Sequence, residues 1–472
     1  MISVARGKQG GGDGKESYFQ NKPNIVFLLA DDMGYGELGC YGQNIIKTPF
    51  LDSLSLEGMK FSRFYANAVC SPSRAALMTG KHPGHTSIRG NSAVGEDDLW
   101  YRMPLRRDEI TMGEYFKSQG YKTGIIGKWH LENPDSLFSW AHERGFDYTL
   151  HRQWNKYGGL NIEGSINQEA MIYESGEAKP LSEVWTKKYV SRDDFRTDKA
   201  IDFINKYEED PFFLFMSYKI PHTPENDIND SLIYKDRGWP EIERQHAGRI
   251  TILDSLIGKL YAHLEDQSLL DNTIFVFTSD NGPHNEGGHD HTFFDSNGPY
   301  RGFKRDFYEG GIRVPLIAYW KDHIIPGSTS NHIATLWDLF PTFIDAIGGE
   351  EPDGLDGISF LPELMGQPQK EHEYLYWELQ LDGWWQELSD GGFRQAILKN
   401  QWKAIRYGVD NPVELYNLEV DPAELRNVAQ QNPQIIKEME ELFRQSSEPT
   451  KGFPYGGKKQ NYKAMDAWLG KK

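Results

Sequence analysis

Four short apolar runs stand out along the chain, and polar residues follow each of them at once. The runs cover residues 25–30, 123–126, 212–216 and 274–277. Apolar residues in continuous rather than alternating order are typical of strands that are buried on both faces of a sheet. Segments with helical character separate the runs, at residues 48–57, 111–119, 193–207 and 241–264. This alternation predicts an α/β domain whose mostly parallel sheet is covered by helices.

The pattern changes after a stretch punctuated by Pro and Gly at residues 348–369. Short, partly alternating runs follow, and an amphipathic helical pattern covers residues 432–446. We therefore expect a smaller antiparallel α+β domain after the larger one, since a single core seldom keeps growing beyond ~300 residues. The predicted division is an unstructured or artificially added leader at 1–22, the α/β domain at 23–370 and the smaller domain at 371–472.

Composition excludes several classes of function. The chain has 472 residues and a formal net charge of −18, which argues against non-specific binding to nucleic acid. No apolar run approaches the ~18 residues of a membrane span, and residues 1–22 lack the apolar segment of a signal peptide. Two cysteines cannot form a disulfide framework, although a single Cys40–Cys70 disulfide is possible.

Acidic and amide side chains follow two of the apolar runs. Asp31 and Asp32 come after the first run, and Asp280 and Asn281 come after the fourth. Ligands bind beyond the carboxyl ends of parallel strands, so these four side chains are expected to meet there. They offer only oxygen ligands, which favours Ca²⁺ or Mg²⁺ over Zn²⁺. The alternative is that Asp31 and Asp32 merely begin a loop.

Basic side chains reach the same predicted edge. Lys128 and His130 follow the second run, His222 follows the third, and Lys304 lies in the polar stretch 281–311. Beside a metal and an anion they are candidates for charge stabilisation and for acid–base chemistry. Solvated or structural roles are the alternative for each.

The polar stretch also contains an imidazole-rich group. A second metal site is one interpretation of it, and a polar active-site loop is the favoured one. The histidines concerned are His284, His289 and His291.

The most distinctive short motif is Cys-Ser-Pro-Ser-Arg at residues 70–74. Pro72 suits the first helical position, and Gly80 can end the helix. Cys70 would then lie where free backbone N–H groups favour an anion, with Arg74 one turn further on the same face. An inert core cysteine is the plainer interpretation of Cys70.

Together these segments resemble the formylglycine-dependent sulfatases, the type I arylsulfatase family of the alkaline phosphatase superfamily. The resemblance extends over about residues 24–427 and implies an alkaline-phosphatase-like fold, with 23–370 as the catalytic domain. Some segments also look like those of bacterial polysaccharide sulfatases. The segments that carry the resemblance are 24–36, 66–80, 127–130, 278–282, 310–315 and 414–418.

The resemblance implies that Cys70 is converted to formylglycine, whose hydrate is the nucleophile. It also implies that Ca²⁺, rather than Mg²⁺, is the bound cation. The conversion needs a partner, either a formylglycine-generating enzyme or an anaerobic sulfatase-maturing enzyme. Family members of this kind suggest a periplasmic or secreted location. The Ca²⁺ ligands implied by the resemblance are Asp31, Asp32, Asp280 and Asn281.

Roles for the basic residues are also implied by the resemblance. Arg74 and Lys128 would steady the hydrate and the sulfate, and Lys304 would also contact the sulfate. His130 would assist breakdown of the sulfated intermediate. His222 would protonate the leaving oxygen.

The expected substrate is a sulfated polysaccharide or oligosaccharide based on galactose or galactosamine. Arg89 and Asn91 are expected to line a sugar subsite. Trp377, Trp384 and Trp385 are either core residues or, where exposed, candidates for stacking on sugar rings. Two other functions stay open at this point. One is hydrolysis of phosphonate or phosphate esters, and the other is non-catalytic binding of sulfated glycans.

Overall fold

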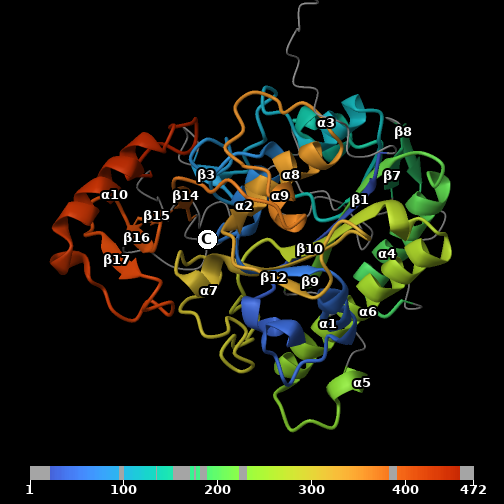
Figure 1. The fold of residues 1–472 in the computed structure, drawn as a ribbon, viewed down its shortest axis with the longest axis horizontal. Coiled ribbons are helices and arrows are strands. Elements are labelled where there is room, and N and C mark those ends of the chain that lie inside the picture. The colour runs from blue at the N-terminus through green and yellow to red at the C-terminus, as the bar shows by residue number, and fades with distance from the viewer. Residues whose placement is uncertain are drawn as a thin grey trace, which may run out of the picture.

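The computed structural model describes residues 22–94, 100–133, 136–151, 171–174, 177–180, 189–222, 231–381 and 391–457. A large sheet with helices on both faces forms most of the molecule, and a smaller sheet lies at one side of it (Figure 1). The strands of the large sheet are β1 (Asn24–Asp31), β2 (Met59–Tyr65), β5 (Lys122–Gly127), β6 (Tyr148–His151), β7 (Met171–Glu174), β8 (Glu177–Pro180), β9 (Phe212–Pro221), β10 (Thr273–Ser279), β11 (Arg313–Tyr319), β12 (Ser328–Ser330) and β13 (Ala334–Thr335).

The sheet is mixed, with a parallel centre. Its order is β12-β2-β11-β10-β1-β9-β5-β6-β7-β8, and β13 also pairs with β2. Strands β10, β1, β9, β5 and β6 run parallel, whereas β11 and β7 pair antiparallel with their inner neighbours. Strands β1, β5, β9 and β10 correspond to the four predicted apolar runs. Because these strands are parallel, their carboxyl ends all reach one edge of the sheet.

Both faces of β1 are buried, which explains why its sequence does not alternate. Ile25, Phe27 and Leu29 join a core that includes side chains of α2, α3, α8 and α9. The intervening residues of β1 face a second core, built with α1, α4 and α6. The helices are α1 (Pro49–Glu57), α2 (Cys70–Thr79), α3 (Met112–Ser118), α4 (Arg192–Lys206), α5 (Ser231–Tyr234), α6 (Glu241–Asp266), α7 (Glu309–Ile312), α8 (Leu339–Ala346), α9 (Leu361–Leu364) and α10 (Pro433–Gln445).

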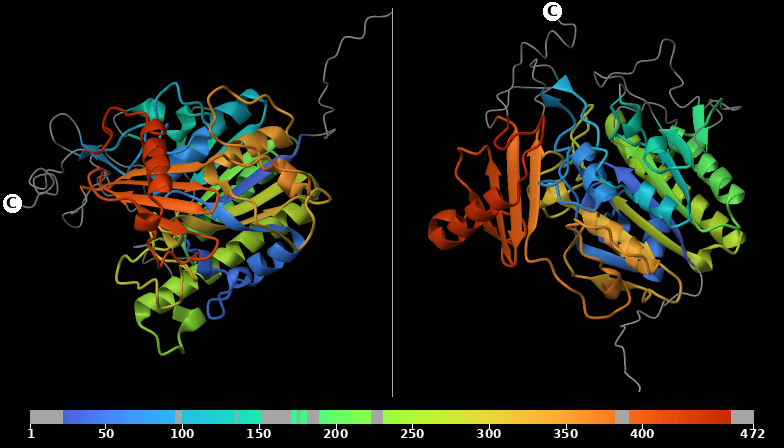
Figure 2. Two further views of the ribbon diagram at one scale, coloured as in Figure 1. Left: turned by 60° about the vertical axis from the view of Figure 1, so that its left-hand side comes forward. Right: turned by 90° about the horizontal axis from the view of Figure 1, so that it is seen from above.

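A separate antiparallel sheet forms near the end of the chain. One of its faces packs on α10 through Met439 and Phe443, and its other face packs on the segment around Tyr65 and Val69. Figure 2 shows this sheet standing beside the large one. Its strands are β14 (Leu375–Gln380), β15 (Phe393–Lys399), β16 (Trp402–Tyr407) and β17 (Glu414–Asn417), and a two-stranded ribbon elsewhere comprises β3 (Ala93–Val94) and β4 (Trp100–Tyr101).

The predicted fold class, a mostly parallel sheet between helices plus a smaller antiparallel α+β unit, is confirmed. The boundary at residue 370 stays a prediction, because side chains from both sheets share one core. None of the described helices combines the length and the apolar character that crossing a membrane requires. Cys40 and Cys70 are both free thiols, so the structure does not contain the disulfide considered above.

Candidate active site

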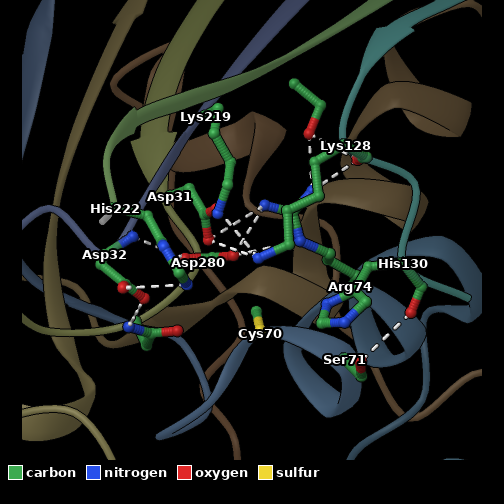
Figure 3. A network of polar contacts seen from close by, with 12 residues as sticks. Asp31, Asp32, Cys70, Ser71, Arg74, Lys128, His130, Lys219, His222 and Asp280 are labelled. Atoms are coloured by element: carbon green, nitrogen blue, oxygen red, sulfur yellow. Dashed lines mark hydrogen bonds and ion pairs between the residues drawn. The ribbon is translucent and has the colours of Figure 1, made fainter. Parts of the chain in front are cut away.

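The ends of the four parallel strands bring the predicted polar residues together. Ala30 at the end of β1 pairs with Ser279 of β10 on one side, and Asp31 pairs with Pro221 of β9 on the other. Gly127 of β5 pairs with Ser217 of β9. The side chains just beyond these positions converge in front of the N-terminus of α2 (Figure 3).

Three carboxylates and one amide form the centre of this cluster. Asp31, Asp32, Asp280 and Asn281 have no exposed surface. Asn281 donates a hydrogen bond of 2.8 Å from Nδ2 to Asp32, and the backbone N–H of Asp32 donates to Asp280 Oδ1 at 3.0 Å. Asn281 Oδ1 is buried and has no hydrogen-bond partner among the described residues. A buried, unpaired oxygen beside three buried carboxylates fits the ligand set of a hard divalent cation.

Each carboxylate in the cluster also contacts a cationic side chain. Lys128 Nζ lies 2.7 Å from Asp31 Oδ1, and Lys304 Nζ lies 2.7 Å from Asp32 Oδ2. Arg74 donates to Asp280 Oδ2 at 2.7 and 3.1 Å. Burial acts to raise the pKa of Asp31, but the surrounding cations, led by Lys128, hold it well below its ordinary value. The same balance lowers the pKa of Asp32 to about 2.

Cys70 is the first residue of α2, where the backbone N–H groups of the first turn have no partner within the helix. Pro72 is therefore the third helical residue rather than the first, which still suits a residue without an N–H group. Gly80 follows the helix with a left-handed φ of 64°, as predicted. The Cys70 side chain is 2% exposed, and its sulfur lies 3.5 Å from Asn91 Oδ1.

The two predicted acid–base histidines flank the cluster, and burial lowers the pKa of both. Burial, with Arg102 and Lys128 nearby, holds the pKa of His130 well below its ordinary value. Burial, with Lys219 and Lys304, does the same for the pKa of His222. His222 Nε2 lies 3.7 Å from Asp32 Oδ2, and Arg102 contacts His130 Nε2 directly.

Sequence reasoning missed two residues on one face of β9. Lys219 Nζ lies 3.1 Å from Asp31 Oδ2, and Ser217 Oγ accepts a 2.5 Å hydrogen bond from Arg74. Ser217 and Lys219 are two apart, so they share a face of the strand. The alternation of polar with apolar residues at the end of this apolar run is the sequence signal that could have identified Ser217 and Lys219 as site residues.

Two further residues reach the site from distant parts of the sequence. Arg102 contacts His130, and Glu286 lies 3.2 Å from Lys304 and 3.9 Å from His222. Burial opposes ionisation of Glu286, but Lys304 and Arg305 lower its pKa to about 2. No local pattern in the sequence marks either residue.

Arg89 is not where the sequence interpretation placed it. Its side chain is fully buried and lies 2.8 Å from Glu378 of β14, with further hydrogen bonds to backbone carbonyls. This position fixes the loop after α2 to the C-terminal sheet and does not support a sugar-binding role for Arg89. Asn91, in contrast, lies beside Cys70 and accepts a 3.2 Å hydrogen bond from the backbone of Ser71.

Of the three tryptophans considered for sugar stacking, the structure describes Trp377. Trp377 is fully buried, and its indole N–H donates to Ala66 O at 2.8 Å, so it is a core residue and not a sugar platform. Trp384 and Trp385 lie outside the described residues.

The imidazole-rich group does not assemble as a second metal site from His284, His289 and His291. His289 instead stacks on His246, with ring centroids 3.7 Å apart, while His291 packs against Phe303. His289 lies in a buried group with Glu37 and His246, and its Nδ1 lies 2.7 Å from Glu243 Oε2.

Comparisons with known proteins agree with this arrangement. A sequence model of the sulfatase family matches residues 23–349, and a model described as "N-sulphoglucosamine sulphohydrolase, C-terminal" matches residues 290–448. An N-acetylgalactosamine-6-O-sulfatase of Bacteroides thetaiotaomicron is 30% identical over 89% of this chain and 92% of its own length. An N-acetylgalactosamine-6-sulfatase of Mus musculus is 29% identical over 92% of this chain and 82% of its own length.

A solved structure, Ps i-CgsB in complex with k-i-k-neocarrahexaose, has a TM-score of 0.77 with this protein. The match is 25% identical and covers 95% of this chain and 97% of that one. The fold, the residues at the strand ends and the family model, which spans more than half of the sequence, lead to one conclusion. The chain belongs to the sulfatase family, whose members are sulfuric ester hydrolases.

Proposed function

We propose that this protein hydrolyses sulfate esters on a carbohydrate based on galactose or galactosamine, and that an aldehyde made from Cys70 supplies the nucleophile. The observation that carries the proposal is the position of Cys70. It begins α2 and faces a cluster that is rich in cationic side chains. The names of the galactosamine-sulfate-cleaving relatives and of the carrageenan-derived ligand support the class of sugar.

Charge is the first requirement that the site meets. A sulfate ester is an anion, and this chain carries a net charge of −18, so binding depends on local positive charge. Arg74, Lys128, Lys219 and Lys304 contribute positive charge, and each is at most 11% exposed. They are ion-paired with Asp31, Asp32 and Asp280, whose charge a bound divalent cation would offset. Cations in such a dry site stabilise the negative charge of the transition state far more than they would in water.

A calcium ion fits the oxygen ligands of Asp31, Asp32, Asp280 and Asn281, and when bound it would supply Lewis-acid stabilisation of a sulfate oxygen. The protein side chains carry the remaining roles. Arg74 is fixed by Asp280, Ser217 and the carbonyl of Lys128, so its guanidinium is held next to Cys70 without further ordering.

Proton transfer is assigned to the two histidines. Burial, with Lys219 and Lys304, lowers the pKa of His222 in the free protein, and an anionic ester bound beside it would raise that pKa and so favour the protonated imidazole. Protonated His222 then donates to the leaving sugar oxygen. His130, on the Cys70 side of the cluster, acts as the base that removes a proton during release of sulfate.

Conversion of Cys70 requires a maturing enzyme, and burial limits when it can act. Because the Cys70 side chain is 2% exposed in the folded chain, we propose that conversion precedes folding of the segment around α2. Either a formylglycine-generating enzyme or an anaerobic sulfatase-maturing enzyme would serve.

Co-expression with a maturing enzyme, followed by hydrolysis assays, tests the proposal. The matured protein should release sulfate from 4-nitrophenyl sulfate faster than it releases phosphate from 4-nitrophenyl phosphate. Chondroitin 6-sulfate and κ-carrageenan oligosaccharides then identify the sugar. Faster phosphate turnover would favour a phosphoesterase. Saturable glycan binding without any turnover by matured protein would favour a non-catalytic glycan-binding protein.

A further inference from the structure

A polar cavity lies at the seam between the large sheet and the C-terminal sheet. Its volume is about 210 Å³. Arg63 of β2 contributes from one side, and residues just before β14 and after β15 contribute from the other. The polar and ionisable side chains in its lining include Arg63, His332, Glu371, His372, Tyr374 and Asn400.

Arg63 gives the cavity an uncompensated positive charge. Within the described part of the chain, no carboxylate forms an ion pair with Arg63 and no hydrogen bond of its guanidinium is found, although its side chain is half-buried. A half-buried arginine usually has an acidic partner, because its charge is costly to desolvate. Glu371 is the carboxylate among the lining residues, and it is exposed and lies beyond ion-pair distance of Arg63.

The opposite wall adds a second basic group and neutral polar groups. His372 lies 2.9 Å from Asp338, and this carboxylate raises the pKa of His372 despite the opposing effect of burial. Asn400 is exposed at the turn between β15 and β16, where its amide has no hydrogen-bond partner among the described residues. Tyr374 adds an aromatic ring. A guanidinium, an amide and a ring are the groups with which proteins contact sugars and their anionic substituents.

The cavity is close enough to Cys70 for one saccharide chain to reach both. Arg63 precedes Cys70 by seven residues, and an extended chain spans at most ~3.6 Å per residue, so their Cα atoms are at most about 25 Å apart. Strand β2 leads from Arg63 to Ala66, four residues before Cys70, and Ala66 O accepts a 2.8 Å hydrogen bond from Trp377 of β14.

We propose that this cavity is an accessory site that binds an anionic group of a sulfated saccharide chain, with Arg63 as its main ligand. The class of ligand rests on the proposed function, whereas the site itself rests on the unpaired cation and the polar walls. Such a site would hold a polymer on the protein while the active site acts on another sulfate of the same chain, which raises the effective concentration of substrate.

Calorimetric titration with a chondroitin 6-sulfate hexasaccharide, repeated with a κ-carrageenan hexasaccharide, tests the site in the non-hydrolysing Cys70→Ala protein. Arg63→Gln in this background should weaken binding of the better hexasaccharide at least tenfold. Arg63→Lys should retain part of it. Arg426→Gln, an exposed arginine away from the cavity, should change nothing. Thermal unfolding checks that each variant is folded.

A desulfated hexasaccharide provides the chemical control and should bind at least tenfold more weakly to the Cys70→Ala protein. Equal binding of the desulfated sugar, unchanged binding in Arg63→Gln, or no binding of either sulfated hexasaccharide would each overturn the proposal. Hydrolysis of 4-nitrophenyl sulfate does not need the cavity, so matured Arg63→Gln should keep full activity on it. Absence of that activity in the matured wild-type protein would instead refute the proposed function.

Discussion

Replacing Gly127 with alanine should disable the active site without touching any of its polar groups. Gly127 ends β5 and has a φ of 107°, and a Cβ atom there would lie 1.8 Å from the backbone oxygen of Ser217. Cβ contacts below 3.0 Å are essentially never seen, so the strands must separate by more than 1 Å. The next residue is Lys128, whose N–H donates to the same Ser217 oxygen at 2.9 Å.

This displacement moves both Lys128 and Arg74, because Arg74 donates to the carbonyl of Lys128 at 2.7 Å. A misplacement of about 1 Å in a catalytic group lowers the rate roughly 100-fold, so kcat of matured Gly127→Ala should fall on that order. The strained φ adds about 1–3 kcal/mol of destabilisation, measurable by denaturant unfolding.

Gly42→Ala is the matched control. Gly42 has a φ of 109°, and a Cβ atom there meets nothing within 4 Å. It carries the same backbone strain without the clash, and it should keep its activity on 4-nitrophenyl sulfate. If Gly127→Ala retained a kcat within threefold of Gly42→Ala, the argument that this close approach positions Lys128 would be wrong.

Three other outcomes are expected from the structure. Arg89→Met leaves Glu378 buried without its cation, so the free energy of unfolding measured by urea titration should drop by about 3–5 kcal/mol. The kcat on 4-nitrophenyl sulfate should stay within a few-fold of the wild-type value. A loss of kcat without a loss of stability would restore a role for Arg89 at the site. Burial raises the pKa of Asp254 to about 6. The folded state therefore binds this proton more tightly than the unfolded state does. The stability of the wild type relative to Asp254→Asn should decline by about 2 kcal/mol from pH 4 to pH 6 as the proton is lost, and a stability difference that does not decline would contradict the assignment. Removal of the metal with a chelator should abolish sulfate release, and Ca²⁺ should restore more activity than Zn²⁺ because the ligands are all oxygens. Greater recovery with Zn²⁺ than with Ca²⁺ would refute the calcium assignment.

Much of the site was predictable because it lies at strand ends. The continuous apolar runs identify β1, β5, β9 and β10, and a parallel arrangement necessarily gathers the residues just beyond these strands at one edge. Asp31, Lys128 and Asp280 could therefore be placed together from the sequence. The helix at Cys70 was predictable from local signals, because Pro72 suits the first turn of a helix and Gly80 can end one.

The remaining residues depend on contacts that no local pattern encodes. Arg89 lies four residues after His85 in an ordinary turn, and only the packing of β14 shows that Glu378 is its partner. Arg102 and Glu286 reach the histidines from loops whose paths are set by tertiary packing. Trp377 fits the pattern of a core residue as well as that of a sugar platform until the seam between the sheets is seen.

An aldehyde derived from Cys70, and not the thiol, carries the proposed reaction. Preparations with graded amounts of maturing enzyme allow the converted fraction of Cys70 to be measured by peptide mass spectrometry. The initial rate of 4-nitrophenyl sulfate hydrolysis is then plotted against that fraction. If the aldehyde is the nucleophile precursor, the points should fall on a straight line through the origin. A rate that stays constant as the converted fraction falls to zero would show that the aldehyde is not needed.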